Sequence, residues 1–165
     1  MYDYNVLIQR ITSYKKFRET AELDKSIRRP NFPEDISENL VKLFLNCENI
    51  KPGDLYSKSL QKIEVKCFSS DGPISFGPKE KWETLIVVDA KNYKKDEYFI
   101  HIINISSSNF NFKCNKLESY KDQIQQKRRP RILWKNLYNQ VSKTFKILLA
   151  NSAMIGTEIE FPASL

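Results

Sequence analysis

Asp54, Glu64 and Lys66 occur close together in the stretch GDLYSKSLQKIEVK, residues 53–66. Its second half alternates apolar and polar residues, as a half-buried β-strand does, so Glu64 and Lys66 lie on one face and Val65 on the other. The nine residues between Asp54 and Glu64 allow two short strands and a turn, so a hairpin can place these two acids side by side. Carboxylates of this kind hold Mg²⁺, and an adjacent ammonium can orient a water molecule. These residue types suit metal-assisted hydrolysis of a phosphodiester.

Helices are expected before this hairpin. The apolar residues between Tyr4 and Leu23 recur at helical spacing, which predicts an amphipathic helix. After the breaker cluster RRPNFPED, Pro33 suits the first turn of a second helix through EDISENLVKLFLN. Glu34 and Glu38 fall in the first two turns of that helix, where interaction with the helix dipole is the simplest explanation for them.

Strands are expected after the hairpin, followed by a last helix. ETLIVVDA is a continuous apolar run typical of a strand buried on both faces, and EYFIHIINI follows as another strand. A weak helical signal lies near KLESYKDQIQQ, a long helix is predicted within residues 127–150, and residues 151–165 look like an irregular tail. The predicted fold class is α/β, with a central mixed β-sheet flanked by helices on both faces.

The composition limits the classes of function. The chain has 165 residues, 41% of them apolar, and an excess of 27 basic over 20 acidic residues, which predicts one domain that attracts polyanions. No run is apolar enough to span a bilayer, and no secretory signal or nucleotide-binding motif is visible. With three widely spaced cysteines and one histidine, His101, we expect a reducing, cytoplasmic location and neither structural zinc nor histidine-dependent nucleophilic catalysis. We expect His101 and Cys67 to be structural.

The hairpin residues resemble a known nuclease signature. The order Pro52-Gly53-Asp54 followed by Glu64-Val65-Lys66 is similar to that of the PD-(D/E)XK nucleases, with a glycine inserted after the proline. Residues 28–90 also resemble segments of type II restriction endonucleases. The resemblance implies a restriction-endonuclease-like α/β/α fold and a single nuclease domain over residues 1–165. Within it, residues 1–32 would be an N-terminal helical part and residues 33–105 the catalytic core.

The resemblance also implies a mechanism and a cofactor. Asp54, Glu64 and the Val65 carbonyl would hold Mg²⁺, Lys66 would orient the attacking water, and cleavage would leave 5′-phosphate and 3′-hydroxyl ends. In several such enzymes a glutamate of the preceding helix joins the site; Glu38 is the first choice here and Glu34 the reserve. Cutting both strands of a symmetric duplex site needs two active sites, so a homodimer is expected.

Double-stranded DNA is the expected partner. Basic residues in loops can reach phosphates, and the loop after the catalytic strand can enter a groove. The candidate DNA-binding residues are Arg28, Arg29, Ser69, Ser70, Asp71, Lys79, Lys81, Lys127, Arg128, Arg129 and Arg131.

Simpler structural interpretations of the same residues remain open. The Glu64 and Lys66 pair could belong to an ordinary surface hairpin, the basic residues could form a solvated face, and Phe76 and Trp82 suit the core better than stacking on a base. Lys62 could pair with Glu64 in place of Lys66. The alternative functions are a junction-resolving or repair nuclease and a non-catalytic DNA-binding accessory module.

Overall fold

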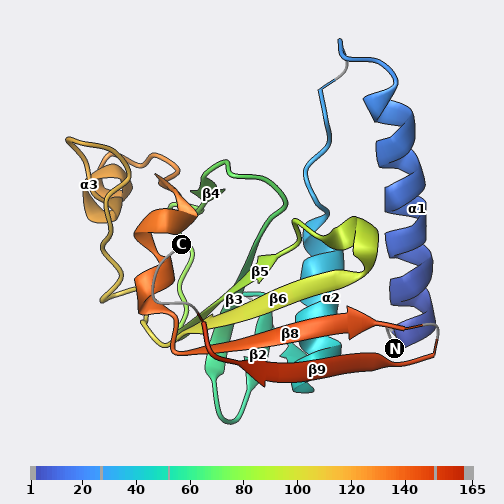
Figure 1. Ribbon diagram of the computed structural model, residues 1–165. Helices are drawn as coiled ribbons and strands as arrows, with labels where there is room; N and C mark the ends of the chain where they lie inside the picture. Colours follow the sequence, from blue (N-terminus) through green and yellow to red (C-terminus); the bar gives the residue numbers. More distant parts are fainter. Residues whose placement is uncertain (1–2, 27, 52, 151, 162–165) are drawn as a thin grey trace.

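A computed structural model describes residues 3–26, 28–51, 53–150 and 152–161. The helices are α1 (Tyr4–Glu22), α2 (Glu34–Leu45) and α3 (Tyr120–Gln125), with 3₁₀ turns η1 (Tyr93–Lys95), η2 (Trp134–Asn136) and η3 (Tyr138–Gln140). The strands are β1 (Glu48–Asn49), β2 (Leu55–Ser57), β3 (Gln61–Phe68), β4 (Ile74–Ser75), β5 (Thr84–Asp89), β6 (Glu97–Ile103), β7 (Arg131–Ile132), β8 (Lys143–Leu149) and β9 (Met154–Ile159). Seven strands form one sheet in the order β1-β2-β3-β5-β6-β8-β9, and β4 pairs with β7 (Figure 1). Only β3 and β5 are parallel neighbours in these two sheets, so the large sheet is mixed, as predicted.

The two N-terminal helices begin and end close to the predicted residues. The Asp3 side chain accepts a hydrogen bond from the Val6 backbone N–H and caps α1. Pro33 is the N-cap of α2, one position earlier than predicted, and Asn46 ends this helix in the left-handed conformation. No helix in the described part of the chain combines the length and the apolar character needed to cross a membrane.

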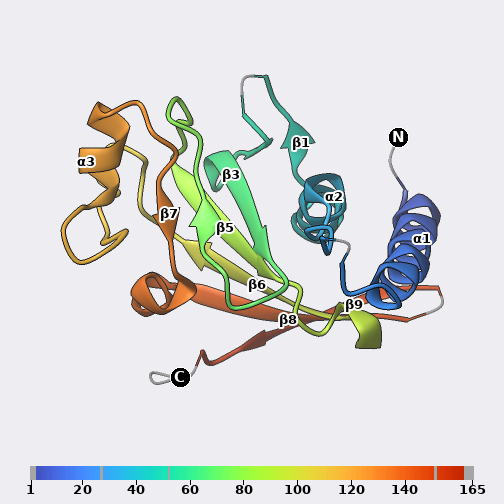
Figure 2. The ribbon, with the colours of Figure 1, turned by 90° about the horizontal axis from the view of Figure 1, so that it is seen from above.

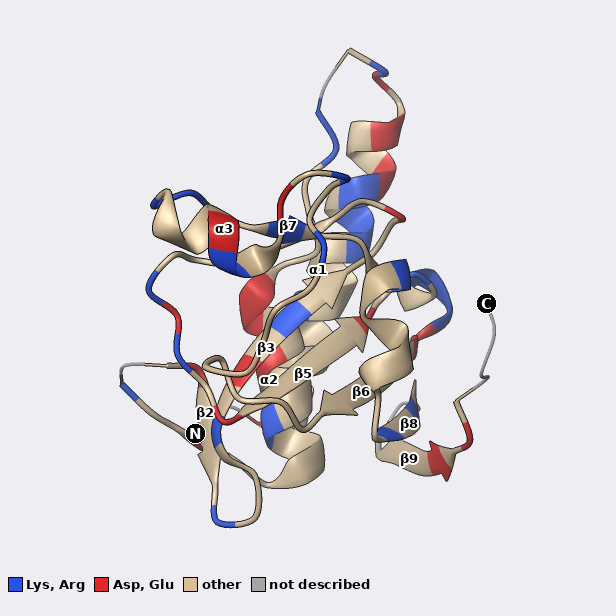
Figure 3. Cartoon of the chain, turned by 90° about the vertical axis from the view of Figure 1, so that its left-hand side faces the viewer, with Lys and Arg blue, Asp and Glu red and all other residues tan. Residues whose placement is uncertain are grey.

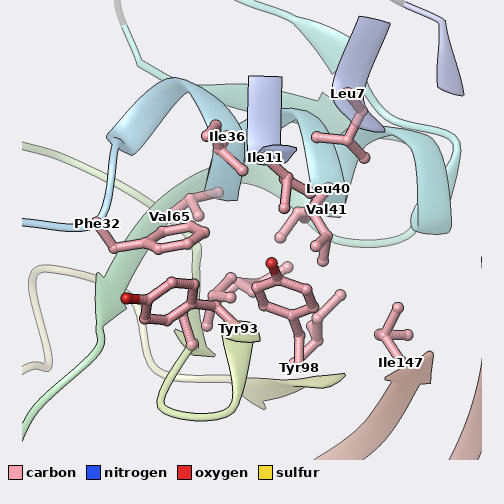
Figure 4. Packing of buried hydrophobic residues seen from close by; sticks show 14 of the residues in the cluster. Leu7, Ile11, Phe32, Ile36, Leu40, Val41, Val65, Tyr93, Tyr98 and Ile147 are labelled. Carbon is pink, nitrogen blue, oxygen red and sulfur yellow. The ribbon is translucent and has the colours of Figure 1, made fainter. Parts of the chain in front are cut away.

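Both faces of the sheet are covered. The first hydrophobic cluster lies under α1 and α2, where Tyr98 and Val65 pack against Ile11, Ile36 and other side chains (Figure 4). The second cluster lies on the opposite face, beneath α3, β4 and β7 (Figure 2). The predicted α/β fold with helices on both faces is therefore confirmed, although short elements cover most of the second face.

Strand β3 carries residues to both clusters. Ile63 and Val65 join the first cluster and Phe68 joins the second, so the residues between them alternate as predicted. Because β5 lies parallel to β3, the connection between them must return along the sheet from the end of one strand to the start of the other. That connection, residues 69–83, runs beside the polar face of β3.

The C-terminal part differs from the prediction. The long helix expected within residues 127–150 is wrong: this segment forms β7, the turns η2 and η3, and β8. The apolar residues whose spacing suggested a helix are divided among β7, the two 3₁₀ turns and β8, and β8 pairs with β6 on one side and β9 on the other. Residues such as Thr144 and Ile147 suit a strand with two neighbours, so sheet pairing overrides the local pattern. The prediction of an irregular tail from residue 151 is also wrong, because Met154–Ile159 form β9. Residues 151 and 162–165 lie outside the described residues.

Strand β9 packs closely against α2, and this contact gives the first prediction. A Cβ built on Gly156 would overlap the Phe44 ring, which also packs edge-on against Phe145. Gly156→Val is therefore expected to lower the free energy of unfolding by about 1–3 kcal/mol, as overpacking does. Urea denaturation would measure this, with Thr157→Val on the same exposed strand as control; equal stability of the two variants would contradict the packing of β9 on α2.

Candidate active site

The β2–β3 hairpin brings Asp54 beside Glu64. Leu55 pairs with Ile63, so the next step of this antiparallel register sets Asp54 opposite Glu64. The Asp54 Oδ2 atom accepts a hydrogen bond of 2.8 Å from the Val65 backbone N–H. A charge-assisted bond of this kind contributes about 1.5–3 kcal/mol, so it fixes the Asp54 carboxylate against β3. Pro52, the first residue of the resembling motif, lies outside the described residues.

Lys66 lies between two carboxylates. Its Nζ atom is 2.7 Å from Glu64 Oε1 and 2.9 Å from Glu80 Oε1. The exposed fractions of the Lys66 and Glu64 side chains are only 14% and 7%, so the reading of a solvated surface hairpin is wrong. Lys62 takes part in no ion pair among the described residues, and Glu64 pairs with Lys66 instead.

Glu80 is the member of this cluster that sequence reasoning missed. It lies in the connection between β3 and β5, fourteen positions after Lys66. The parallel arrangement of these strands returns the chain to the level of Glu64, because β5 starts opposite Ile63. A single acid between Lys79 and Lys81 in a turn-rich loop carries no local signal for this contact.

The helix α2 adds further acids to the site. Glu38 is half-buried, and its pKa is raised to about 7 by burial and by the nearby charges of Asp54, Glu34 and Asp35, against a lowering by Lys66. Acidic positions of α2 thus lie beside the charged positions of β3 (Figure 3). Glu34 is exposed and lines the neighbouring cavity.

The site holds more negative than positive charge. The pKa of Glu64 is raised to about 7, because burial outweighs the lowering by Lys66 and the nearby charges of Asp54 and Glu80 also raise it. Burial also raises the pKa of Asp54, against the Val65 hydrogen bond and Lys66. A divalent cation would offset this crowding of carboxylates around one ammonium.

The donor set fits Mg²⁺. Among the residues that the structure describes, no three His, Cys, Asp or Glu side chains already converge on one metal position. Mg²⁺ needs no such cage, since one or two carboxylates with water and phosphate oxygens complete its shell. Asp54 and Glu64 supply two carboxylates, and one oxygen of Glu80, Oε2, is buried without a hydrogen-bond partner in the described structure.

The raised pKa of Glu38 gives a prediction on stability. A carboxyl whose pKa is higher in the folded than in the unfolded protein stabilises the fold when protonated and loses this contribution as the pH rises toward about 7. Glu38→Gln in metal-free buffer is therefore expected to stabilise the protein by about 1 kcal/mol at pH 8, discounted for solvent screening. That corresponds to a rise in Tm of roughly 2–4 °C, with little change at pH 5. Differential scanning calorimetry at both pH values would check it; an equal shift at both would contradict the ionisation of Glu38.

A cavity adjoins the site and gathers several predicted DNA-binding residues. Its volume is about 360 Å³, and Lys66 lies in its wall with Ser69 and Ser70. Arg28 and Arg131, which are far apart in the sequence, line the same cavity. The connection between α1 and α2 thus meets β7 beside the catalytic strand.

A second cavity lies beyond Glu80. It has a volume of about 500 Å³ and is lined by Lys79, Lys81 and Lys121, with Tyr120 of α3. Four of the predicted basic residues thus line a cavity: Arg28 and Arg131 the first, Lys79 and Lys81 the second. The pair formed by Lys66 and Glu80 lies near both cavities.

The remaining predicted DNA-binding residues are not brought to these cavities. Asp71 pairs with Lys91 at 2.5 Å, and Arg128 pairs with Glu118 at 2.9 Å. The other three are exposed and line neither cavity: Arg29, Lys127 and Arg129.

The residues expected to be structural are buried or partly buried. Phe76 and Trp82 are fully buried in the second cluster, which confirms the core reading against stacking on a base. The Nδ1 atom of His101 lies 2.9 Å from the Thr144 hydroxyl, and burial lowers the pKa of this histidine to about 4. Burial raises the pKa of the Cys67 thiol, which leaves it protonated at neutral pH and unreactive.

The chain is similar to a known protein family over most of its length. A family model described as Bsp6I restriction endonuclease matches residues 2–141, which include Asp54, Glu64, Lys66 and Glu80. No curated protein and no solved structure matches. A match over this share of the sequence agrees with the resemblance to type II restriction endonucleases, enzymes that act on DNA. The chain belongs to the Bsp6I restriction endonuclease family.

Proposed function

We propose that this restriction endonuclease is a Mg²⁺-dependent, sequence-specific enzyme of the PD-(D/E)XK type, which cuts duplex DNA to leave 5′-phosphate and 3′-hydroxyl ends. One observation carries the proposal: the hairpin sets Asp54 opposite Glu64, with the Lys66 ammonium bound to Glu64 in a mostly buried position. The family match supports a nuclease but leaves the metal and the products open.

Each residue of the cluster has a role in this proposal. Asp54 and Glu64 would hold the ion together with the Val65 carbonyl, and Glu38 would add a further carboxylate from α2. When bound, Mg²⁺ would neutralise charge at the scissile phosphate and lower the pKa of a water molecule. Lys66 orients the attacking water and interacts with the phosphoryl oxygens.

The cavity beside Lys66 is where the scissile strand would lie. Arg28, in the connection between α1 and α2, and Arg131, in β7, line this cavity and carry the charge that phosphates require. Ser69 and Ser70, directly after β3, would contact the same strand. We also propose a homodimer, since cutting both strands of a symmetric site needs two copies of this site.

Loss of one of these arginines should change the salt dependence of DNA binding. Arg131→Ala is expected to weaken binding to all duplex sequences and to reduce the slope of log K against log salt concentration by about 1. Arg128→Ala, whose side chain is already paired with Glu118, should reduce it less. Fluorescence anisotropy at several salt concentrations would measure both slopes, and equal slopes in these two variants would contradict the placement of DNA at this cavity.

Cleavage of long duplex DNA tests the proposed function. The purified protein would be incubated with Mg²⁺ and, separately, with a chelator, and the products sized and end-sequenced. Discrete fragments that require Mg²⁺ and share a sequence at 5′-phosphorylated ends support the proposal. Preference for branched over linear duplex would favour a junction-resolving or repair nuclease. Binding without cleavage at any metal concentration would favour a non-catalytic module.

A further inference from the structure

The loop that carries Glu80 is anchored on both sides. Phe76 and Trp82 are fully buried, and the Phe76 backbone N–H donates to the Pro130 carbonyl at 2.9 Å. The Trp82 indole N–H donates to the Ile105 carbonyl at 3.0 Å. Lys79 and Lys81 are exposed, whereas Glu80 between them is only partly exposed and reaches Lys66. The loop is therefore held in place at both ends and directs the Glu80 carboxylate toward β3.

A glycine makes room for that carboxylate. A Cβ added at Gly77 would lie 2.7 Å from Glu80 Oε1 and 2.9 Å from its carboxyl carbon. A side chain at position 77 would therefore displace the same oxygen that binds the Lys66 ammonium. The other carboxylate oxygen of Glu80 is buried and has no hydrogen-bond partner within the described residues.

Glu64 has two tasks in the proposed reaction, and they compete. Its Oε1 atom is 2.7 Å from Lys66 Nζ, yet its carboxylate is also one of the proposed ligands of the cation. A carboxylate that turns its charge toward Mg²⁺ holds an ammonium less strongly. Lys66 has a long, flexible stem, so its head group needs a second partner to keep one position. The Phe76 ring, 5.5 Å away, provides a weak contact of this kind, and Glu80 provides a charged one.

We propose that Glu80 is a positioning residue for Lys66, which holds the ammonium in place from the connection between β3 and β5 when Glu64 binds the cation. This inference rests on the proposed function of the same site. Glu80 acts through Lys66 and need not touch DNA.

Three variants test the role of Glu80. Glu80→Gln removes the charge and keeps the shape, Gly77→Ala leaves Glu80 in the chain and displaces its carboxylate, and Glu83→Gln makes the same charge change at an exposed position of the same loop. For each, the order of the Lys66 side chain is measured by ¹³Cε NMR relaxation, without metal and with Mg²⁺ but without DNA. Steady-state cleavage kinetics with Mg²⁺ give kcat and KM separately.

The expected result separates the variants. In the wild type and in Glu83→Gln, Lys66 stays ordered after Mg²⁺ is added. In Glu80→Gln and Gly77→Ala, Lys66 becomes mobile on addition of Mg²⁺, and kcat falls by about tenfold or more with a change in KM of less than about twofold, because misplacement of a reacting group acts on the chemical step.

Two failures remain distinguishable. Unchanged Lys66 order in both Glu80→Gln and Gly77→Ala would overturn the role of Glu80, whatever the wild type does to DNA. Absence of Mg²⁺-dependent cleavage by the wild type would overturn the proposed function and, with it, the need for Lys66 to be held. Both proposals are supported if the wild type cleaves DNA with Lys66 ordered, and if the two variants show a mobile Lys66 and a lower kcat.

Discussion

Asp54→Asn is expected to bind duplex DNA at least as tightly as the wild type and to cleave it at least about 10³-fold more slowly. A bound metal ion supplies several kcal/mol of charge stabilisation, and each 1.36 kcal/mol corresponds to a factor of ten in rate. The asparagine side chain retains an oxygen that can accept the Val65 N–H bond, so the β2–β3 hairpin should stay intact. Single-turnover cleavage and anisotropy on the same DNA would measure the two quantities.

The control for this variant is Asp24→Asn. Asp24 is exposed in the connection between α1 and α2, and its carboxylate accepts the same kind of hydrogen bond, from the Ser26 backbone N–H. It should cleave at the wild-type rate. A cleavage rate for Asp54→Asn within about tenfold of the control would show that Asp54 is not a ligand of the metal ion, since loss of a ligand to a catalytic ion lowers the rate by more than this.

Lys66→Met is expected to lose about 10²–10³-fold in cleavage rate while it still binds a divalent cation. A rate loss of this size is expected when one charged group that stabilises the charge developing in the transition state is removed. The variant also leaves Glu64 and Glu80 without their shared counter-ion in a mostly buried position. The pKa of Glu64 is already raised to about 7 and should rise further without Lys66, so this carboxyl would take up a proton in the fold. Lys66→Met should therefore be more destabilised at pH 8 than at pH 6.

Lys62→Met provides the matched comparison. Lys62 lies on the same strand and the same face as Lys66 and forms no ion pair within the described part of the chain. It should keep its cleavage rate and show the pH dependence of stability of the wild type. Equal losses of cleavage rate in Lys62→Met and Lys66→Met would indicate that cleavage depends on positive charge anywhere on this face of β3 and not on the position of the Lys66 ammonium.

The hairpin and the N-terminal helices could be predicted because their signals are local. Strand alternation puts Glu64 and Lys66 on one face, and a turn of limited length puts Asp54 opposite them. The place of Glu38 at the site could be predicted because α2 directly precedes the hairpin. The sequence alone gives stabilisation of the helix dipole as an equally good reason for an acidic residue there.

Contacts that depend on strand order could not be predicted. Glu80 reaches Lys66 only because β5 pairs in parallel with β3, and the sequence does not fix that order. The same limit explains the wrong C-terminal helix: Ile132 and Leu137 recur at helical spacing, yet their segment contributes to the second hydrophobic cluster through β7 and 3₁₀ turns. Arg28 and Arg131 likewise meet at one cavity only in the fold.

Titration with Mn²⁺, followed by electron paramagnetic resonance of the free ion, tests most directly that these carboxylates form a metal site. Mn²⁺ takes the same hard oxygen ligands as Mg²⁺. The wild type, Lys66→Met and Glu83→Gln are expected to bind the ion, whereas Asp54→Asn and Glu64→Gln should bind it at least about tenfold more weakly, as variants of ligands and their partners do. Equal Mn²⁺ binding by the wild type, Asp54→Asn and Glu64→Gln would contradict the site.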